Sequence, residues 1–69
     1  MSEVRTLARS PLHFLPGDTI TVEGMLVRVD RVIPLTANLV RVEGNVMSFQ
    51  TSLVLGTNQV MKVQRTVTD

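Results

Sequence analysis

The chain has 69 residues, no cysteine and a formal net charge of +1. A chain of this length makes at most one domain, here residues 1–69, and without cysteine it has neither a disulfide framework nor a thiolate metal site to reinforce its small core. The charges alternate in sign and give no field that points to nucleic acid or a membrane, and no apolar run approaches the ~20 residues of a spanning helix.

The first fifteen residues fit two conformations. The alternation of Val4, Thr6 and Ala8 suits a strand or extended arm, whereas apolar residues at positions 4, 7 and 8 suit a helical turn. Pro11 ends either element. Up to residue 15 we then expect a loop whose apolar members cap one end of the fold: Leu12, Phe14 and Leu15.

A turn and a strand are predicted next. Proline at position 16 fixes φ, and Gly17 accepts the positive φ of a type II turn, so Pro16, Gly17 and Asp18 end the loop. Residues 19–22 alternate polar and apolar, which predicts a strand with Ile20 and Val22 on its inner face. From here to the end of the chain the pattern is that of a β-meander.

Glu23 and Gly24 predict a tight hairpin turn into a second strand over residues 25–33. This strand begins with residues 25, 27 and 29 facing inward, but Val32 falls out of that phase. A β-bulge near residues 30 and 31 would restore the register. Pro34 ends the strand, and residues 34–38 form a loop.

The rest of the chain is predicted as further strands between turns. We expect a strand over 39–43 with Val40 and Val42 inward, a hairpin turn at Gly44 and Asn45, a strand over 46–51 with Phe49 in the core, a loop at 56–58 and a last strand over 59–67. The sequence therefore predicts an all-β fold, a small, partly open barrel of five or six strands.

The segment from Leu15 to Gly24, continued by the valines at positions 27, 29 and 32, resembles the opening hairpin of SH3-like barrels. Barrels of the KOW type and the N-terminal domain of bacterial elongation factor P are the most similar. The resemblance implies an SH3-like barrel. The lysine-bearing loop by which elongation factor P is recognised has no counterpart at residues 34–38, so no functional residue is carried over.

Residues that could carry chemistry are sparse. His13 is the one histidine, it lies in the predicted N-terminal loop, and the six carboxylates are scattered along the chain. We interpret His13 as a half-exposed loop residue, because catalysis needs a nucleophile or an acid–base pair gathered in a pocket. We expect no enzyme, no metal site and no cofactor.

Several predicted strands carry adjacent apolar residues, which point to opposite faces. Only one face of a small sheet can be core, although a bulge or the end of a barrel can bury part of the surplus. The remainder would form a protein interface. The candidates are Leu26, Val54, Val60 and Met61.

Nucleic acid is the alternative partner. Three cations can project outward from neighbouring strands as a small basic stripe: Arg28, Arg41 and Lys62. Cross-strand ion pairs with the carboxylates at positions 23, 30 and 43 would explain the same residues without a ligand. Both phenylalanines are expected in the core, which leaves no aromatic side chain for base stacking.

These observations predict a non-enzymatic protein-interaction or assembly module, since oligomerisation or partner binding is the reinforcement left to a small domain without disulfides or metal. Its partner would be another protein or a second copy of the chain, and no membrane or small-molecule substrate is expected. We expect an accessory, regulatory or structural protein of a bacterium or bacteriophage, located in the cytoplasm or in a virion. A small nucleic-acid-binding barrel is the alternative.

Overall fold

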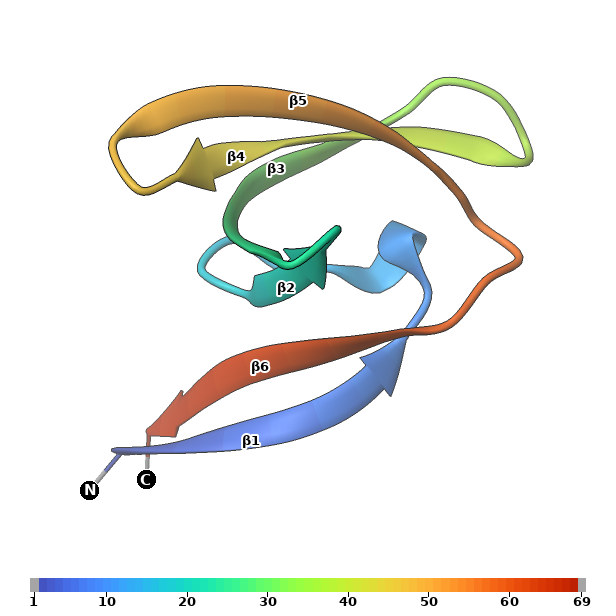
Figure 1. Cartoon of the computed structure of the whole chain (residues 1–69). Helices are drawn as coiled ribbons and strands as arrows, with labels where there is room; N and C mark the ends of the chain where they lie inside the picture. The colour runs from blue at the N-terminus through green and yellow to red at the C-terminus, as the bar shows by residue number, and fades with distance from the viewer. Residues whose placement is uncertain (1, 69) are drawn as a thin grey trace.

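The computed structural model describes residues 2–68 and contains one antiparallel sheet of six strands, in the order β1-β6-β2-β3-β4-β5 (Figure 1). The elements are β1 (Ser2–Arg9), a short 3-10 helix η1 (Pro11–His13), β2 (Thr19–Val22), β3 (Met25–Pro34), β4 (Leu39–Val46), β5 (Phe49–Gly56) and β6 (Met61–Thr68). The prediction of an all-β fold with five or six strands is confirmed. The sheet is not closed, and β1 and β5 are its two edges.

Strands β2 to β5 follow one another as a meander, but β6 does not continue it. The chain crosses from β5 back to the far side of β2, where β6 lies between β2 and β1 and pairs with both (Figure 1). Three hydrogen bonds of Thr57 hold the connection: its carbonyl accepts from Ser10 Oγ at 2.7 Å, its N–H donates to the Asn38 carbonyl at 2.9 Å, and its Oγ1 donates to the Ala37 carbonyl at 3.2 Å. Of the two conformations predicted for the N-terminal segment, the strand is the one that forms, because β1 pairs with β6 along its whole length.

The turn before β2 forms as expected. The Asp18 N–H donates to the Leu15 carbonyl at 3.0 Å, and Gly17 has φ of 93°, as the second central position of a type II turn requires. The Gly17 N–H donates to the Val29 carbonyl at 2.8 Å, and the Val29 N–H donates to the Asp18 carbonyl at 2.7 Å. The turn is thus bound to the middle of β3, and this contact positions Asp18 in the interior.

The hairpin between β2 and β3 has a two-residue turn at Glu23 and Gly24, since Val22 pairs with Met25. Both turn residues have positive φ, 50° and 79°, which is the type I′ geometry. Glycine adopts this conformation freely, whereas glutamate is strained in it and asparagine tolerates it.

We therefore expect Glu23→Asn to stabilise the domain by about 0.5 to 1 kcal/mol. Thermal unfolding of the two proteins measures the difference. Glu23→Gln is the control, because it removes the same charge but keeps the strained side-chain type. A gain of equal size in both variants would assign the effect to charge and not to the turn.

The predicted bulge in β3 is confirmed. The β3–β4 register shifts between Val29 and Arg31, so that Asp30 is the extra residue and β3 bends there. Opposite the bulge lies Gly44, and a Cβ built on Gly44 would be only 2.2 Å from the Arg28 carbonyl oxygen. The bend therefore requires glycine on the facing strand, because the backbones approach too closely for a side chain.

The prediction of a turn at Gly44 and Asn45 is wrong. Both residues lie within β4, and the chain reverses at Met47 and Ser48, where Met47 has φ of 56°. Glycine next to asparagine is a common hairpin signal, but glycine in a strand also marks a close backbone contact. Here the close contact decides, since Gly44 packs against β3.

The core lies on the inner face of the bent sheet. It consists of Phe14, Ile20, Val27, Val29, Val40, Val42 and Val63. Val40 and Val42 face inward as predicted, and Phe14 caps the core from the loop after η1, while Leu12 and Leu15 stay about half exposed.

Two residues predicted to face the core are exposed. Phe49 is 73% exposed and Met25 is 48% exposed. Each is the residue directly after a hairpin turn, so its side chain lies at the margin of the sheet, beyond the reach of the opposing core residues. Strand alternation predicts the face of a residue but not how far the core extends along the strand.

Candidate functional site

The predicted interface residues are largely at the surface. Leu26, Val54 and Val60 are exposed, as predicted, whereas Met61 is partly buried and packs against the core from the first position of β6. The exposed three do not form one patch. Leu26 pairs with Thr21 of β2, whereas Val54 pairs with Arg41 of β4 and Val60 lies in the loop before β6.

The β4–β5 hairpin carries two further exposed apolar residues that the sequence patterns did not identify. Met47 in its turn is 92% exposed and Phe49 follows at the start of β5, while the predicted Val54 lies further along the same strand. A signal for this region is present in the sequence: residues 44–61 contain no charged side chain, and Glu43 and Lys62 are the flanking charges. We call residues 44–61 the charge-free segment.

The basic residues of the predicted stripe project from the outer face of the sheet. Arg28 pairs with Thr19, and Thr19 pairs with Gln64, so these side chains form one row, with Lys62 next to it on the same face of β6. Arg41 is separated from this row, because Glu43 precedes Asn45, the partner of Arg28, on the same face of β4. The structure thus brings Arg28 and Lys62 to one region but not Arg41.

The sequence offered cross-strand ion pairs between these three cations and nearby carboxylates, but the carboxylates have other partners. Glu43 pairs with Arg31, and the Asp30 carboxylate accepts a hydrogen bond from the Asn45 amide at 2.7 Å. Within residues 2–68, neither Arg28, Arg41 nor Lys62 belongs to an ion pair. Their charges therefore stay available on the outer face.

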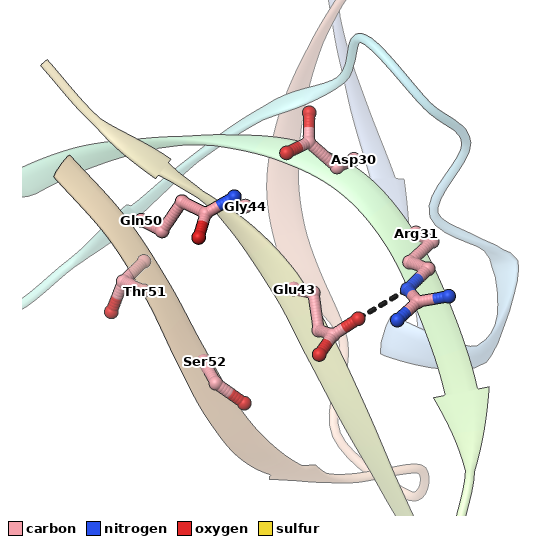
Figure 2. A pocket seen from close by; sticks show the side chains of 7 residues that line it. All are labelled: Asp30, Arg31, Glu43, Gly44, Gln50, Thr51 and Ser52. Carbon is pink, nitrogen blue, oxygen red and sulfur yellow. Dashed lines mark hydrogen bonds and ion pairs between the residues drawn. The ribbon is translucent and has the colours of Figure 1, made fainter. Parts of the chain in front are cut away.

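A polar pocket of about 510 Å³ lies on β3, β4 and β5 (Figure 2). Figure 2 shows Gln50, Thr51 and Ser52 along β5 and the ion pair between Arg31 and Glu43 at the opposite side. The lining residues are Asp30, Arg31, Glu43, Gly44, Gln50, Thr51 and Ser52.

The chemistry available in the pocket is hydrogen bonding. Its two carboxylates already have partners, Arg31 for Glu43 and Asn45 for Asp30. Ser52 lies opposite Glu43 across the β4–β5 pair, and the Glu43 carboxylate is held by Arg31. His13 belongs to η1 and does not line the pocket. The pocket can therefore accept polar groups.

One carboxylate, that of Asp18, is buried and accepts three hydrogen bonds. Asp18 is 1% exposed, and its two oxygens accept hydrogen bonds from Arg65 Nε and Nη2, both at 2.8 Å, and from the Leu15 N–H at 2.8 Å. Burial by itself raises the pKa of Asp18, but the hydrogen bonds from Arg65 and Leu15 and the Arg65 charge outweigh it, so the pKa falls below its ordinary value of 3.8. Both oxygens of the carboxylate have hydrogen-bond partners, so we assign Asp18 a structural role.

Comparison with protein-family models, curated proteins and solved structures finds no match. Within residues 2–68 there is no cluster of three or more potential metal ligands of the histidine, cysteine and carboxylate types. In the same part of the chain, no helix has the length and hydropathy needed to cross a bilayer. The chain's own geometry is therefore the basis for assigning a function.

Proposed function

We propose that the protein is a non-enzymatic interaction or assembly module that uses its β4–β5 hairpin as a protein-binding surface. The observation that carries the proposal is the exposure of Met47, Phe49 and Val54 in the part of the β4–β5 hairpin that belongs to the charge-free segment. Exposed apolar residues scattered singly are normal on a protein surface. Three of them within one charge-free segment, with Phe49 on the inner-face side of β5 and Val54 on its outer face, are typical of an edge that is covered in an assembly.

We also propose that the bent sheet is an open variant of an SH3-like barrel. The type II turn that places Asp18 in the interior, the two-residue hairpin at Glu23 and Gly24, and the bulge that bends β3 support this proposal. Such barrels serve many unrelated functions, so the fold adds nothing to the choice of partner.

The test is the triple variant Met47→Gln, Phe49→Thr and Val54→Thr, measured by sedimentation velocity over a concentration series and by capture of binding partners. Because these side chains are exposed, we expect the variant to fold and to weaken the association at least tenfold through the lost apolar contacts. The control is a triple variant at exposed apolar residues outside the hairpin: Val4→Thr, Leu12→Gln and Leu15→Gln. We expect the control to associate as the wild type does.

A wild-type protein that stays monomeric at all concentrations and captures no protein would contradict the proposal. Retention on nucleic acid at low salt, lost with rising salt and with Arg28→Ala, would favour the alternative function instead. Arg28 is the appropriate position for that test because it lies on the same outer face as Lys62, across β2, and has no ion-pair partner within residues 2–68.

A further inference from the structure

The two edges of the sheet differ in how they are protected. Figure 1 shows β1 and β5 along opposite margins of the fold, and within residues 2–68 each pairs with one neighbour only, β1 with β6 and β5 with β4. The β1 edge carries Glu3, Arg5 and Arg9, and charged side chains on an edge strand discourage pairing with another strand. The β5 edge carries no charge, no proline and no bulge.

An unprotected edge presents a row of backbone N–H and C=O groups that a further strand can satisfy. Along β5 this row runs through eight residues, and the register with β4 is regular from Val46 and Phe49 to Leu39 and Gly56. The flanking turn and loop belong to the same charge-free segment, so no charge of β5 or its connections opposes a second strand. The unused hydrogen-bonding edge and the exposed apolar residues thus lie on the same hairpin.

From this coincidence we infer that β5 pairs antiparallel with β5 of a second copy of the chain, which joins two sheets into one across a two-fold axis. The inference rests on the proposed function and names its partner. A second copy fits because every residue of β5 is uncharged, so two β5 strands side by side bring no charged residues together. A charged partner strand would gain nothing from this edge, since ion pairing requires a charge on both sides.

Symmetry restricts the register. An antiparallel pair with a two-fold axis keeps the faces of the two sheets aligned only when one residue lies opposite itself. With Ser52 on the axis, Phe49 lies opposite Leu55 of the second copy, Gln50 opposite Val54, and Thr51 opposite Leu53. With Leu53 on the axis, Phe49 would lie opposite position 57, outside the strand.

The register centred on Ser52 gives cross-strand neighbours to the two most exposed apolar side chains of β5. Phe49, 73% exposed in one chain, gains an aliphatic cross-strand neighbour in Leu55, and the exposed Val54 gains the stem of Gln50. Ser52 on the axis is small and exposed, so two copies of it fit opposite each other. The assembly would be a twelve-stranded sheet with β1 at both ends, since each copy contributes six strands.

The decisive test places charges on the axis. Ser52→Lys and Ser52→Glu each put two like charges opposite one another, so we expect sedimentation velocity to show at least a tenfold weaker dimer for either variant alone. Mixing the two variants puts opposite charges on the axis, and we expect the dimer to return. Thr6→Lys is the matched control, an exposed outer-face residue of the β1 edge, and we expect it to dimerise as the wild type does.

A second measurement fixes the register. The chain has no cysteine, so Ser52→Cys introduces a single thiol. Residues directly opposite in an antiparallel pair have Cα atoms roughly 4.5–5.5 Å apart, within the range a disulfide can span. We expect oxidised Ser52→Cys to form a covalent dimer rapidly and oxidised Val54→Cys to remain monomeric, because the register places the two Val54 positions about 13 Å apart.

The outcomes separate this inference from the function it rests on. A dimer that tolerates both axis charges, or an Ser52→Cys protein that does not cross-link, would overturn the β5 pairing and leave an assembly module that uses another contact. A monomer that binds a different protein through Met47, Phe49 and Val54 would overturn the second copy as partner and keep the function. A wild-type protein that neither dimerises nor binds another protein would overturn both proposals.

Discussion

Asp18→Ala is expected to destabilise the domain by about 3 kcal/mol, because it breaks a buried ion pair and leaves the Leu15 N–H without its acceptor. Asp18 is 1% exposed and joins the turn before β2 to Arg65 on β6. For a domain of this length a loss of that size lowers the midpoint of thermal unfolding by about 15 °C. Circular dichroism during heating measures it.

Two comparisons make this prediction specific. Glu3→Ala removes a carboxylate from an exposed ion pair with Arg5, so we expect a change below about 0.5 kcal/mol. Arg65→Met is expected to destabilise the domain as well, because it leaves the Asp18 carboxylate buried without its cation. If Asp18→Ala and Glu3→Ala unfolded at the same temperature, the ion pair would have no role in stability.

The same ion pair predicts the acid response of the protein. The pKa of Asp18 is lower in the folded than in the unfolded chain, so the folded state holds fewer protons on this group near pH 4. Its contribution to stability is complete above the unfolded value of 3.8 and is lost as the pH falls through the lower, folded pKa. We expect the wild type to lose stability below about pH 3.8 and Asp18→Asn to show a flatter curve there.

Gly44→Ala is expected to cost about 3 kcal/mol, as much as the loss of the ion pair. The added Cβ would lie 2.2 Å from the Arg28 carbonyl oxygen and 3.0 Å from its carbon. Both atoms are backbone, so the clash is relieved only if β3 and β4 separate beside the bulge, where Val29 and Gly44 pair. The free energy of unfolding in urea measures the loss.

Gly56→Ala is the matched control. Its new Cβ would approach the Asn58 side-chain oxygen at 3.2 Å, and a flexible, exposed side chain can move away. We expect a change within about 0.5 kcal/mol. Equal losses in the two variants would mean that the close backbone approach at Gly44 does not limit the fold.

The candidate site was predictable only in part. Exposure of Leu26, Val54 and Val60 followed from adjacent apolar residues that cannot all face one core. The exposure of Phe49 did not follow, because its position in the strand suits the inner face and the core ends before it. The charge-free segment is visible in the sequence, but its meaning depends on β5 being an edge strand.

Much of this structure follows from local chemistry that is visible in the sequence alone. Glycine at positions 17 and 24 specifies its turns because only glycine adopts their positive φ without strain, and alternation identifies the inner face of β2 and β4. Val32 does not fit the inward alternation of residues 25, 27 and 29, and this predicted the bulge in β3, because side chains along a strand alternate with a fixed period of two.

Tertiary structure decided what depends on distant contacts. The placement of β6 between β1 and β2 requires partners from both ends of the chain, and the pairing of Asp18 with Arg65 follows from that placement. Gly44 has the signature of a turn but serves a close approach between two strands, which local pattern cannot reveal. Which strand is left at the edge, and thus where we propose that a second copy binds, is likewise a property of strand order and not of any single segment.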